Sequence, residues 1–592
     1  MAAMLNLYYT VADKCVGFPA RKGGRAHNRS AAALPVRKRR LGSDASASCM
    51  KKHLSSYGES RPSYAVTMDR KNPIAGSAPS NEPDGIGIIE FLGGKNFLIT
   101  GGTGFLAKVI IEKILRTTPD VGKIYVLIKA KDSKAALKRL QNEIVGTELF
   151  KCLEQLHGKD YRHFLARKLV TVVGNVREAN MGIAPELADE IAKTVDIIIN
   201  SAANTTFDER YDIAMDVNTM GPFRLMSFAR RFSKLKLFLH VSTAYVNGRR
   251  QGVVLEKPFS LGDTITKELG YSDSSGLQNT VLDIEAEIKL AFCSRHNSND
   301  AASFSQEMKD LGIERAKLHG WQDTYVFTKA MGEMVLDSMR GEIPVVTIRP
   351  SIIEGTCSEP IPGWIEGIRM LDPIMLYYAK GRLSGFPADG DGVVDVVPAD
   401  MVANATLAAV AKHAQAIGAA QEMHIYHVGS STANPLIWRS MFTFFFQHFT
   451  RYPFNLASGQ PIKVAPMRLF GSMLQFNTNL ERDMLLWGAG ETLSPRARML
   501  FSKYAEKIIH LARMYQPYGF YGCRFDNANT EALFTEMSVE EKAQFHFDVR
   551  SIEWKDYLTN VHIPGFLKHV MKGRGYSSQC IATSMYTVEV IV

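Results

Sequence analysis

The sequence predicts a doubly wound α/β fold with a smaller, mainly helical C-terminal domain. Three observations support this prediction. Short apolar runs alternate with helical patterns, a glycine-rich turn follows the first run, and 592 residues are too many for a single hydrophobic core. We expect buried strands within residues 95–100, 123–131, 169–174, 195–203, 235–242 and 343–351.

The first elements form a βαβ unit. The folded body is expected to begin near Gly87, and KNFLIT (95–100) is typical of a buried strand. In KVIIEKILRTT (108–118) the apolar residues are spaced to line one face of a helix, and KIYVLIKAK (123–131) is typical of a second strand. The glycine turn therefore lies at the C-terminal end of the first strand, where open parallel sheets bind their ligands.

Composition and pattern divide the chain into five predicted segments. They are a basic leader (1–83), a nucleotide-binding domain (86–400), a substrate-side region that completes this domain (401–490), a helical C-terminal domain (491–575) and a tail (576–592). Aromatic residues at helical spacing in the C-terminal domain are interpreted as core rather than as ligand contacts.

The positive charge is concentrated in the leader. Residues 1–82 hold 14 Lys and Arg against 5 Asp and Glu, whereas the rest of the chain holds 56 against 55. A leader that is basic, poor in acids and rich in Ser and Ala is typical of a transit peptide. We expect import into a plastid, with mitochondrial import as the rival. The basic run at residues 37–40 is also compatible with a nuclear signal, but nothing downstream supports nucleic-acid binding.

Two classes of protein are disfavoured by the remaining composition. No apolar run reaches the length of a membrane-spanning helix, which leaves only peripheral membrane contact open. The most apolar stretch, MFTFFFQHF (441–449), is interpreted as a buried helix or strand, with a membrane-surface or acyl-contacting segment as the alternative. The seven cysteines contain no CxxC pair, which argues for a reducing compartment and against a disulfide scaffold or a zinc site. We predict no metal.

The glycine turn TGGTGFLAK (100–108) has the features of a dinucleotide-binding loop. Gly101 is free to adopt backbone angles denied to other residues, and Gly104 lets the start of the helix approach a pyrophosphate. The free N–H groups of that helix start favour negative charge. With Ala107 in the last small position, the spacing is the one common in short-chain and extended dehydrogenase/reductases. The cofactor-binding residues predicted here are Thr100, Gly101, Thr103, Gly104, Phe105 and Leu106.

The end of the second strand indicates which nicotinamide cofactor binds. Enzymes that use NAD place an acidic side chain there for the ribose 2′-hydroxyl, whereas a 2′-phosphate requires a cation. This strand ends in Lys129-Ala-Lys131, with no acid before Asp132. We therefore predict NADPH, bound with the help of Lys129 and Lys131.

A tyrosine and a lysine supply the predicted proton-transfer pair. Tyr325 and Lys329 lie four residues apart in a helical pattern, so both side chains share one face. A free tyrosine is a poor acid at neutral pH, and a nearby ammonium group stabilises its phenolate. In HVSTAYVNG (240–248), which follows an apolar strand, a hydroxyl is placed to hydrogen-bond a reacting carbonyl oxygen. Thr243 is the predicted catalytic hydroxyl, with Ser242 as the adjacent candidate.

Longer strings resemble one family. TGGTGFLAKVIIEKIL, TFDERYD (206–212), HVSTAYVNG, YVFTKAMGE and GWIEG (363–367) are similar to the alcohol-forming fatty acyl reductases, also called the male-sterility family. The resemblance runs from about Gly87 to about Arg574. With its basic leader the chain most resembles the plastid branch of plants, of the male-sterility and defective-pollen-wall type.

The resemblance implies an activity and further site residues. The implied reaction is NADPH-dependent reduction of a long-chain acyl thioester, on acyl carrier protein or coenzyme A, to a primary alcohol for surface lipids or the pollen wall. Residues 491–575 match the family's small "sterile" domain, which would cover the acyl tunnel or bind the carrier. Asn175 stands where the family usually has Asp near the adenine, and Asn218 would support a proton-relay water or make a helix-start contact. Ala202 and Pro350 complete the predicted cofactor site, while Arg349 is interpreted as structural.

Three alternatives share parts of this pattern. A sugar-nucleotide epimerase or dehydratase shares the fold and Thr243, Tyr325 and Lys329, but lacks the C-terminal domain. A non-enzymatic NADPH-binding regulator would lose the Tyr/Lys pair, which is intact here. A thioester reductase that stops at the aldehyde is not distinguished by any residue of the sequence.

Overall fold

The computed structural model describes residues 84–270, 281–293, 301–415, 423–456, 458–488 and 495–574. The predicted leader (1–83) and tail (576–592) lie outside the described residues. The described residues belong to one compact unit. The boundaries predicted at residues 400 and 490 stay predictions.

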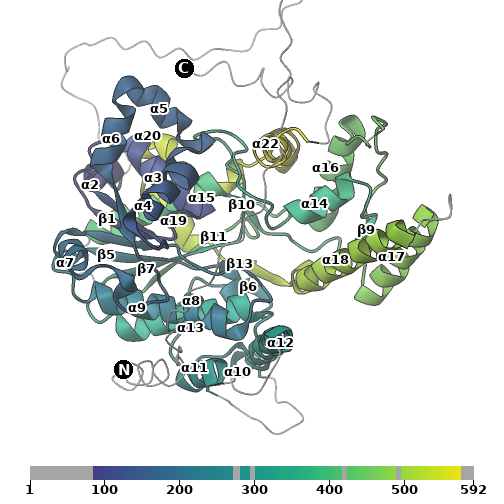
Figure 1. The fold of residues 1–592 in the computed structure, drawn as a ribbon, viewed down its shortest axis with the longest axis horizontal. Coiled ribbons are helices and arrows are strands. Elements are labelled where there is room, and N and C mark those ends of the chain that lie inside the picture. The colour runs from purple at the N-terminus through teal and green to yellow at the C-terminus, as the bar shows by residue number, and fades with distance from the viewer. Residues whose placement is uncertain are drawn as a thin grey trace, which may run out of the picture. The chain divides into compact units, whose positions relative to one another are not determined.

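A parallel sheet of seven strands forms the centre of this unit, in the order β11-β7-β5-β4-β1-β2-β3 (Figure 1). The strands are β1 (Phe97–Thr100), β2 (Ile124–Ile128), β3 (Leu169–Val173), β4 (Ile197–Asn200), β5 (Leu237–Val241), β7 (Val345–Pro350) and β11 (His424–Val428). Each of the six predicted runs contains one of them. Strand order reverses between β1 and β4, so the doubly wound α/β prediction is confirmed.

Helices cover both faces of the sheet (Figure 1). On one face lie α2 (Ile88–Leu92), α3 (Phe105–Thr117), α15 (Ala399–Gln415) and α19 (Ala528–Glu536). On the other lie α8 (Tyr211–Asn218), α9 (Met220–Ala229) and α13 (Thr324–Met339). The α13 helix carries the predicted Tyr/Lys pair and packs on α8 and α9.

The remaining helices connect strands or form the C-terminal part. In chain order they are α4 (Ser133–Leu140), α5 (Lys151–His157), α6 (Tyr161–Lys168), α7 (Pro185–Thr194), α10 (Ile265–Glu268), α11 (Ile284–Cys293), α12 (Ala301–Leu318), α14 (Asp372–Ala379), α16 (Trp438–Arg451), α17 (Met473–Gly488), α18 (Pro495–Gly519), α20 (Val539–Gln544), α21 (Trp554–Asp556) and α22 (Ile563–His569). None of the helices within the described ranges is long and apolar enough to cross a bilayer.

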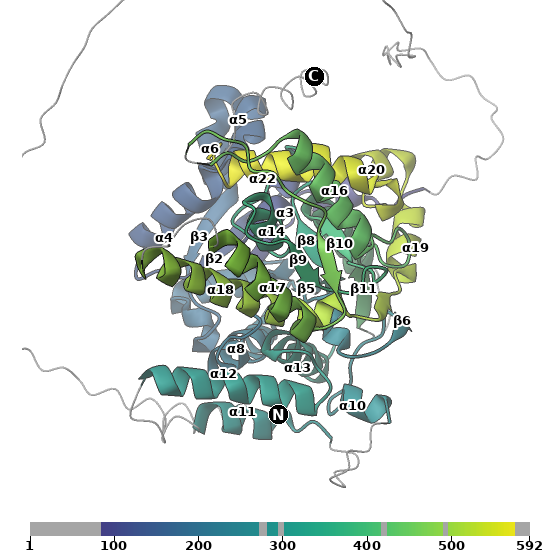
Figure 2. The same cartoon turned by 90° about the vertical axis from the view of Figure 1, so that its right-hand side faces the viewer.

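Three two-stranded parallel pairs join distant parts of the chain. They are β6 (Gly252–Val254) with β13 (Cys523–Phe525), β8 (Ile352–Glu354) with β10 (Val396–Pro398), and β9 (Gly385–Pro387) with β12 (Arg468–Phe470). Figure 2 shows β8, β9 and β10 in front of the main sheet, between it and α17. The first pair hydrogen-bonds the predicted C-terminal domain to the segment that follows β5.

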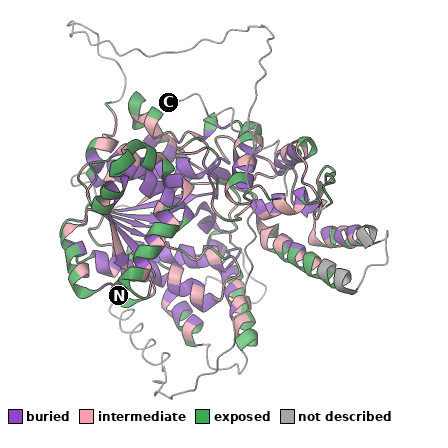
Figure 3. Ribbon diagram, turned by 45° about the horizontal axis from the view of Figure 1, so that its top comes forward, coloured by how far each residue is buried: buried purple, intermediate pink, exposed green. Residues whose placement is uncertain are grey.

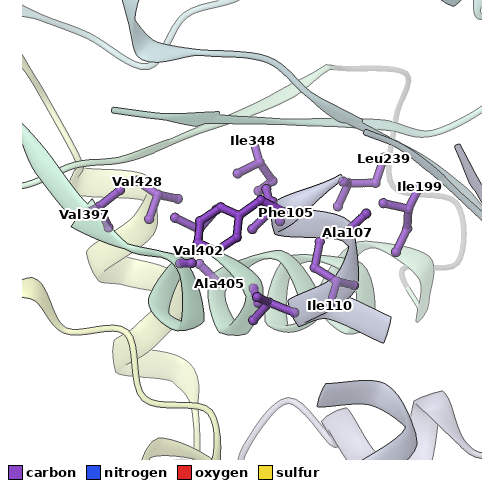
Figure 4. Packing of buried hydrophobic residues seen from close by; sticks show 14 of the residues in the cluster. Phe105, Ala107, Ile110, Ile199, Leu239, Ile348, Val397, Val402, Ala405 and Val428 are labelled. Carbon is purple, nitrogen blue, oxygen red and sulfur yellow. The ribbon is translucent and has the colours of Figure 1, made fainter. Parts of the chain in front are cut away.

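The core lies between the sheet and its helices. Buried residues follow the strands and the inward sides of the helices, while exposed residues lie on the outer helix surfaces (Figure 3). Phe105 and Ile110 of α3 pack near Val402 of α15 and Ile199 of β4 (Figure 4). Burying each such large apolar side chain contributes about 1.5–3 kcal/mol.

Two helical predictions are resolved by this packing. The α3 helix is buried on all sides, not only on the predicted apolar face, because its charged residues are paired. Lys108, for example, lies 2.7 Å from Glu366. The MFTFFFQHF run lies in α16, where Met441, Phe442, Phe445 and Phe449 are buried, so the buried-helix prediction is confirmed.

Candidate active site

The glycine turn fits a dinucleotide pyrophosphate. Gly101 has φ of 68°, and a Cβ added there would lie 2.8 Å from Cα of Ala202. Gly104 begins α3 without a side-chain cap, so the first N–H groups of the helix are left for a ligand. A side chain at Gly101 would meet the backbone of Ala202, and one at Gly104 would meet the carbonyl oxygen of Gly101, so this tight turn requires glycine at both positions.

Thr100 and Ala202 hold the ends of the two central strands together. Thr100 Oγ1 donates to Asn200 Oδ1 over 2.7 Å and accepts from the backbone N–H of Ala202 over 3.2 Å. These contacts fix the crevice at the point where strand order reverses, which is where doubly wound sheets bind ligands.

A cation that the sequence did not point to, Arg139 of α4, contacts the end of β2. Lys129 and Lys131 are exposed, as a loop position predicts. Arg139 of α4 donates to the carbonyl of Lys129 over 2.7 Å and reaches to 3.5 Å from Thr103 Oγ1, while it is paired with Glu143. Its guanidinium therefore bridges the glycine turn and the strand end. The only signal in the sequence was its place on the helix that follows the second strand.

The predicted catalytic residues meet at the C-terminal ends of β5 and β7. Thr243 begins the short helix η5 (Ala244–Asn247), and its Oγ1 donates to the carbonyl of Pro350 over 3.3 Å. Tyr325 and Lys329 approach from α13, whose first turn is capped by Asp323. Ser242 Oγ is buried and has no hydrogen-bond partner among the described residues.

Burial sets the protonation of the tyrosine. It raises the pKa of Tyr325 above its usual value, the Asp323 carboxylate adds to the rise, and a hydrogen bond with Thr243 lowers it in part. The phenol is therefore held protonated, as a proton donor must be. The predicted effect of Lys329 on this phenol stays a prediction, since Lys329 is not among these causes.

Lys329 is directed at the end of β5. Its Nζ donates to the carbonyl of Val241 over 2.7 Å and lies 3.4 Å from His240 Nε2. Burial lowers the pKa of Lys329 to about 8, although Glu333 acts in the opposite direction. The ammonium form thus prevails at neutral pH but is easily lost above it.

The other predicted cofactor residues have structural contacts. The Asn218 amide accepts from the N–H of Asn204 and donates to the Asn204 carbonyl and to Thr328 Oγ1, at 2.9, 2.9 and 3.1 Å. It thereby joins α8 to α13. Asn175 closes the turn after β3 through the N–H of Arg177 and the carboxylate of Glu178.

One cavity of about 550 Å³ joins the glycine turn to the predicted catalytic residues. It is lined by Gly104, Ser242, Thr243, Tyr325, Lys329 and Pro350, so the glycine turn and the catalytic residues share a single space. Apolar side chains form much of the remaining wall, among them Ile352, Ile353, Val394 and Trp438.

The C-terminal part forms a wall of the cavity. The lining residues from this part include Tyr515, Tyr518, Tyr521 and Phe525. Tyr518 and Phe525 belong to the buried core and Tyr515 and Tyr521 pack against it, as predicted, but all four also border the cavity. Tyr518 donates a hydrogen bond to Asp323, and its ring centroid lies 5.3 Å from that of Phe207.

The same part fixes the loop that forms the opposite wall. Ile368, Arg369 and Met370 line the cavity, and Tyr515 donates a hydrogen bond to the carbonyl of Met370. Asp372 follows this loop, accepts from the N–H of Arg369 over 2.9 Å and lies 3.1 Å from Nε2 of His562. Phe207 of TFDERYD lines the cavity, and GWIEG directly precedes the lining residues of this loop.

Family models and known proteins agree with this architecture. A family model described as "Male sterility protein" matches residues 99–406, and a second model with the same description, named Sterile, matches residues 483–573. The chain is 52% identical over 511 residues to the chloroplastic fatty acyl-CoA reductase 2 of Arabidopsis thaliana, covering 85% of this chain and 82% of that one. It is 38% identical over 505 residues to the alcohol-forming fatty acyl-CoA reductase of Simmondsia chinensis, covering 82% and 99%.

A solved structure supports the fold. The terminal R domain of the myxalamid PKS-NRPS pathway aligns with a TM-score of 0.51 at 14% identity, covering 81% of this chain and 92% of that one. The glycine turn together with the matched NAD-binding model establishes a nicotinamide cofactor. On the extent and identity of these matches, the chain belongs to the male sterility protein family of fatty acyl reductases.

Proposed function

We propose that this protein reduces a long-chain fatty acyl thioester to a primary alcohol through an aldehyde, with NADPH as the reductant. The observation that carries the proposal is the single cavity in which the glycine turn, the buried Thr243, the half-buried Tyr325 and an apolar wall meet. The polar groups suit a reacting carbonyl, and the apolar wall suits an acyl chain.

The side chains of the cavity have distinct roles in the first reduction. NADPH, when bound at the glycine turn, supplies the hydride. Thr243 and Tyr325 donate hydrogen bonds to the carbonyl oxygen as negative charge develops on it. Tyr325 then protonates this oxygen, and collapse of the hemithioacetal breaks the C–S bond and releases a thiol and an aldehyde.

The second reduction uses the same residues on the aldehyde. A second hydride equivalent and a proton from Tyr325 convert the aldehyde to the alcohol, so one thioester consumes two NADPH. Lys329 holds its positive charge beside the end of β5, where it stabilises the tyrosinate left after each proton transfer and binds the nicotinamide ribose. Asn218 holds α8 against α13 and so keeps Tyr325 in place.

Three cations support NADPH over NADH. Lys129 and Lys131 stand where NAD enzymes have an acid, and Arg139 lies between this strand end and the glycine turn. A ribose 2′-phosphate at this position would be met by the guanidinium of Arg139, whose planar fork matches phosphate geometry.

We also propose that the protein acts in plastids, on acyl groups of acyl carrier protein, for surface-lipid or pollen-wall precursors. The basic leader supports import, and the relative from Arabidopsis thaliana is named chloroplastic. Fusion of residues 1–83 to a fluorescent reporter tests this proposal. A nuclear, diffuse or mitochondrial signal would contradict it.

The reaction is tested with the purified chain and long-chain acyl thioesters of carrier protein and of coenzyme A. NADPH oxidation is followed, and the lipid products are extracted and identified. Two NADPH per alcohol are expected. Aldehyde without alcohol would reject the four-electron reduction, and absence of oxidation with either thioester would reject the proposed function.

A further inference from the structure

The helix α18 joins the wall of the cavity to a cationic surface. Its C-terminal half contributes Met514, Tyr515 and Tyr518 to the cavity, whereas Lys503, Lys507 and Arg513 are exposed. From Tyr518 to Lys507 the helix spans about 16 Å at its usual rise per residue. A single helix thus reaches from the cavity wall to solvent.

The residue spacing places most of these cations on the same face of α18 as Met514, which lines the cavity. Met499, Lys503, Lys507, His510 and Met514 follow one another at steps of four, four, three and four residues, which places them on one face of the helix. Met514 lines the cavity and Met499 is 53% exposed. We call residues 499, 503, 507 and 510, together with the adjacent Arg513, the α18 stripe.

The stripe carries uncompensated positive charge. Within the described part of the chain, no ion pair is found for Lys503, Lys507 or Arg513. His510 lies 3.7 Å from Asp208, and Asp208 also contacts Lys309. The acid on α18 itself is Glu506, which accepts from Ser502. A single exposed lysine usually only increases solubility. Three unpaired cations on one helix that leads to a cavity create a positive potential that attracts an acidic partner.

We propose that the α18 stripe is the docking surface for an acidic acyl carrier protein, a proposal that rests on the thioester reduction proposed above. A carrier presents its thioester on a flexible phosphopantetheine arm, so its surface must bind at arm's length from the reacting carbonyl. Lys507 of the stripe lies about 16 Å along α18 from Tyr518, which lines the cavity. Its charge complements an acidic helix, and Met499 offers an apolar contact within a polar rim.

The neighbouring elements extend this surface. The α17 and α18 helices lie side by side (Figures 1 and 2). Arg382 places its guanidinium 5.2 Å from the ring of Tyr504 on α18, and Lys380 beside it is exposed. The exposed face of α18 between residues 502 and 516 is almost entirely polar, which favours a protein surface over insertion into a bilayer.

Charge reversal tests the proposal independently of catalysis. Binding of fluorescently labelled holo acyl carrier protein to the full chain is measured for wild type and for Lys503→Glu/Lys507→Glu. We expect about a tenfold or greater rise in Kd, and a wild-type Kd that weakens steeply with salt. Lys193→Glu/Lys234→Glu is the matched control, because both lysines are exposed and precede the N-terminal ends of β4 and β5, whereas the cavity lies at the C-terminal ends of the strands.

Steady-state kinetics with two thioesters distinguish an effect on carrier binding from an effect on the reaction itself. In the stripe variant, kcat/KM for acyl carrier protein thioester should fall about tenfold with kcat retained, while kcat/KM for acyl coenzyme A stays within about twofold. Equal losses for both thioesters, or an unchanged carrier Kd, would overturn the proposal. Loss of binding to anionic vesicles with carrier binding intact would assign the stripe to a membrane surface instead. A wild type that binds carrier but reduces neither thioester would reject the proposed function and leave the docking result standing.

Discussion

Lys329 donates a hydrogen bond through its Nζ to the main-chain carbonyl of Val241 over 2.7 Å. This contact joins α13 to the last residue of β5, directly before Ser242 and Thr243. Tyr325, the proposed proton donor, lies one turn earlier on the same helix, so this contact helps to position both its phenol and the Thr243 hydroxyl. The ammonium group that makes this connection is almost completely buried.

Removing either predicted donor should slow the reaction without unfolding the protein. Tyr325→Phe removes the transferred proton, and we expect kcat to fall about 10²–10⁴-fold. Thr243→Val removes one donor to the developing oxyanion, with an expected loss of about 10²–10³-fold. Steady-state NADPH oxidation measures both changes.

Tyr521→Phe is the matched control for these variants. Tyr521 lines the same cavity, but its hydroxyl donates to the carbonyl of Gly248 over 2.7 Å. Its loss should change kcat only a few-fold. A Tyr325→Phe enzyme with the wild-type rate would remove Tyr325 from the role of proton donor.

Activity should decline on the alkaline side because of Lys329. Burial lowers the pKa of this lysine to about 8, so in the free enzyme the ammonium form is present below this pH and is lost as pH rises through it. We expect kcat/KM for NADPH to fall above pH 8. The pH profile of initial rates measures this limb, and a flat profile between pH 7 and 9.5 would show that the charge on Lys329 is not required.

The sequence predicts the central strands well because they depend on local patterns, and the residues predicted to be catalytic from short motifs come together in space. All six predicted runs contain strands, and Thr243, Tyr325 and Lys329 line one cavity. The aromatic wall was not predictable, because Tyr515 and Tyr518 reach the cavity only through the packing of α18. The spacing of aromatic residues along a helix does not show whether the face that they form packs against a core or lines a cavity.

Arg139 is another residue that the local sequence pattern did not reveal, and it should determine the preference for NADPH over NADH. Arg139→Gln removes the cation between Thr103 and the end of β2. A charge-assisted contact to a phosphate is worth about 1.5–3 kcal/mol, so kcat/KM for NADPH should fall about 10–100-fold. The rate with NADH should hardly change.

Lys138→Gln provides the control for Arg139, since Lys138 is the exposed cation next to it on α4. Initial rates with both cofactors at equal concentrations give the ratio directly. Equal losses with NADPH and NADH would indicate that Arg139 supports the turn through Glu143 rather than recognising a 2′-phosphate.

The buried pair Arg349–Glu333 should be required for stability. Both side chains are fully buried, and Arg349 also donates to the carbonyl of Lys257 over 3.0 Å and lies 5.2 Å from the ring of Phe259. These contacts support the structural role predicted for Arg349. Glu333→Gln leaves the guanidinium without its counter-charge, and we expect a loss of about 3–5 kcal/mol in the free energy of unfolding. Denaturant unfolding measures it.

A double variant separates charge from packing at this pair. Arg349→Met/Glu333→Met removes both charges at once and should cost less than Glu333→Gln alone, because no buried charge remains unpaired. Loss of the Glu333 carboxylate also removes the attraction that raises the pKa of Lys329. In the folded fraction of either variant, the alkaline limb of kcat/KM should therefore move to lower pH. A limb that stays at its wild-type position would show that Glu333 affects stability alone.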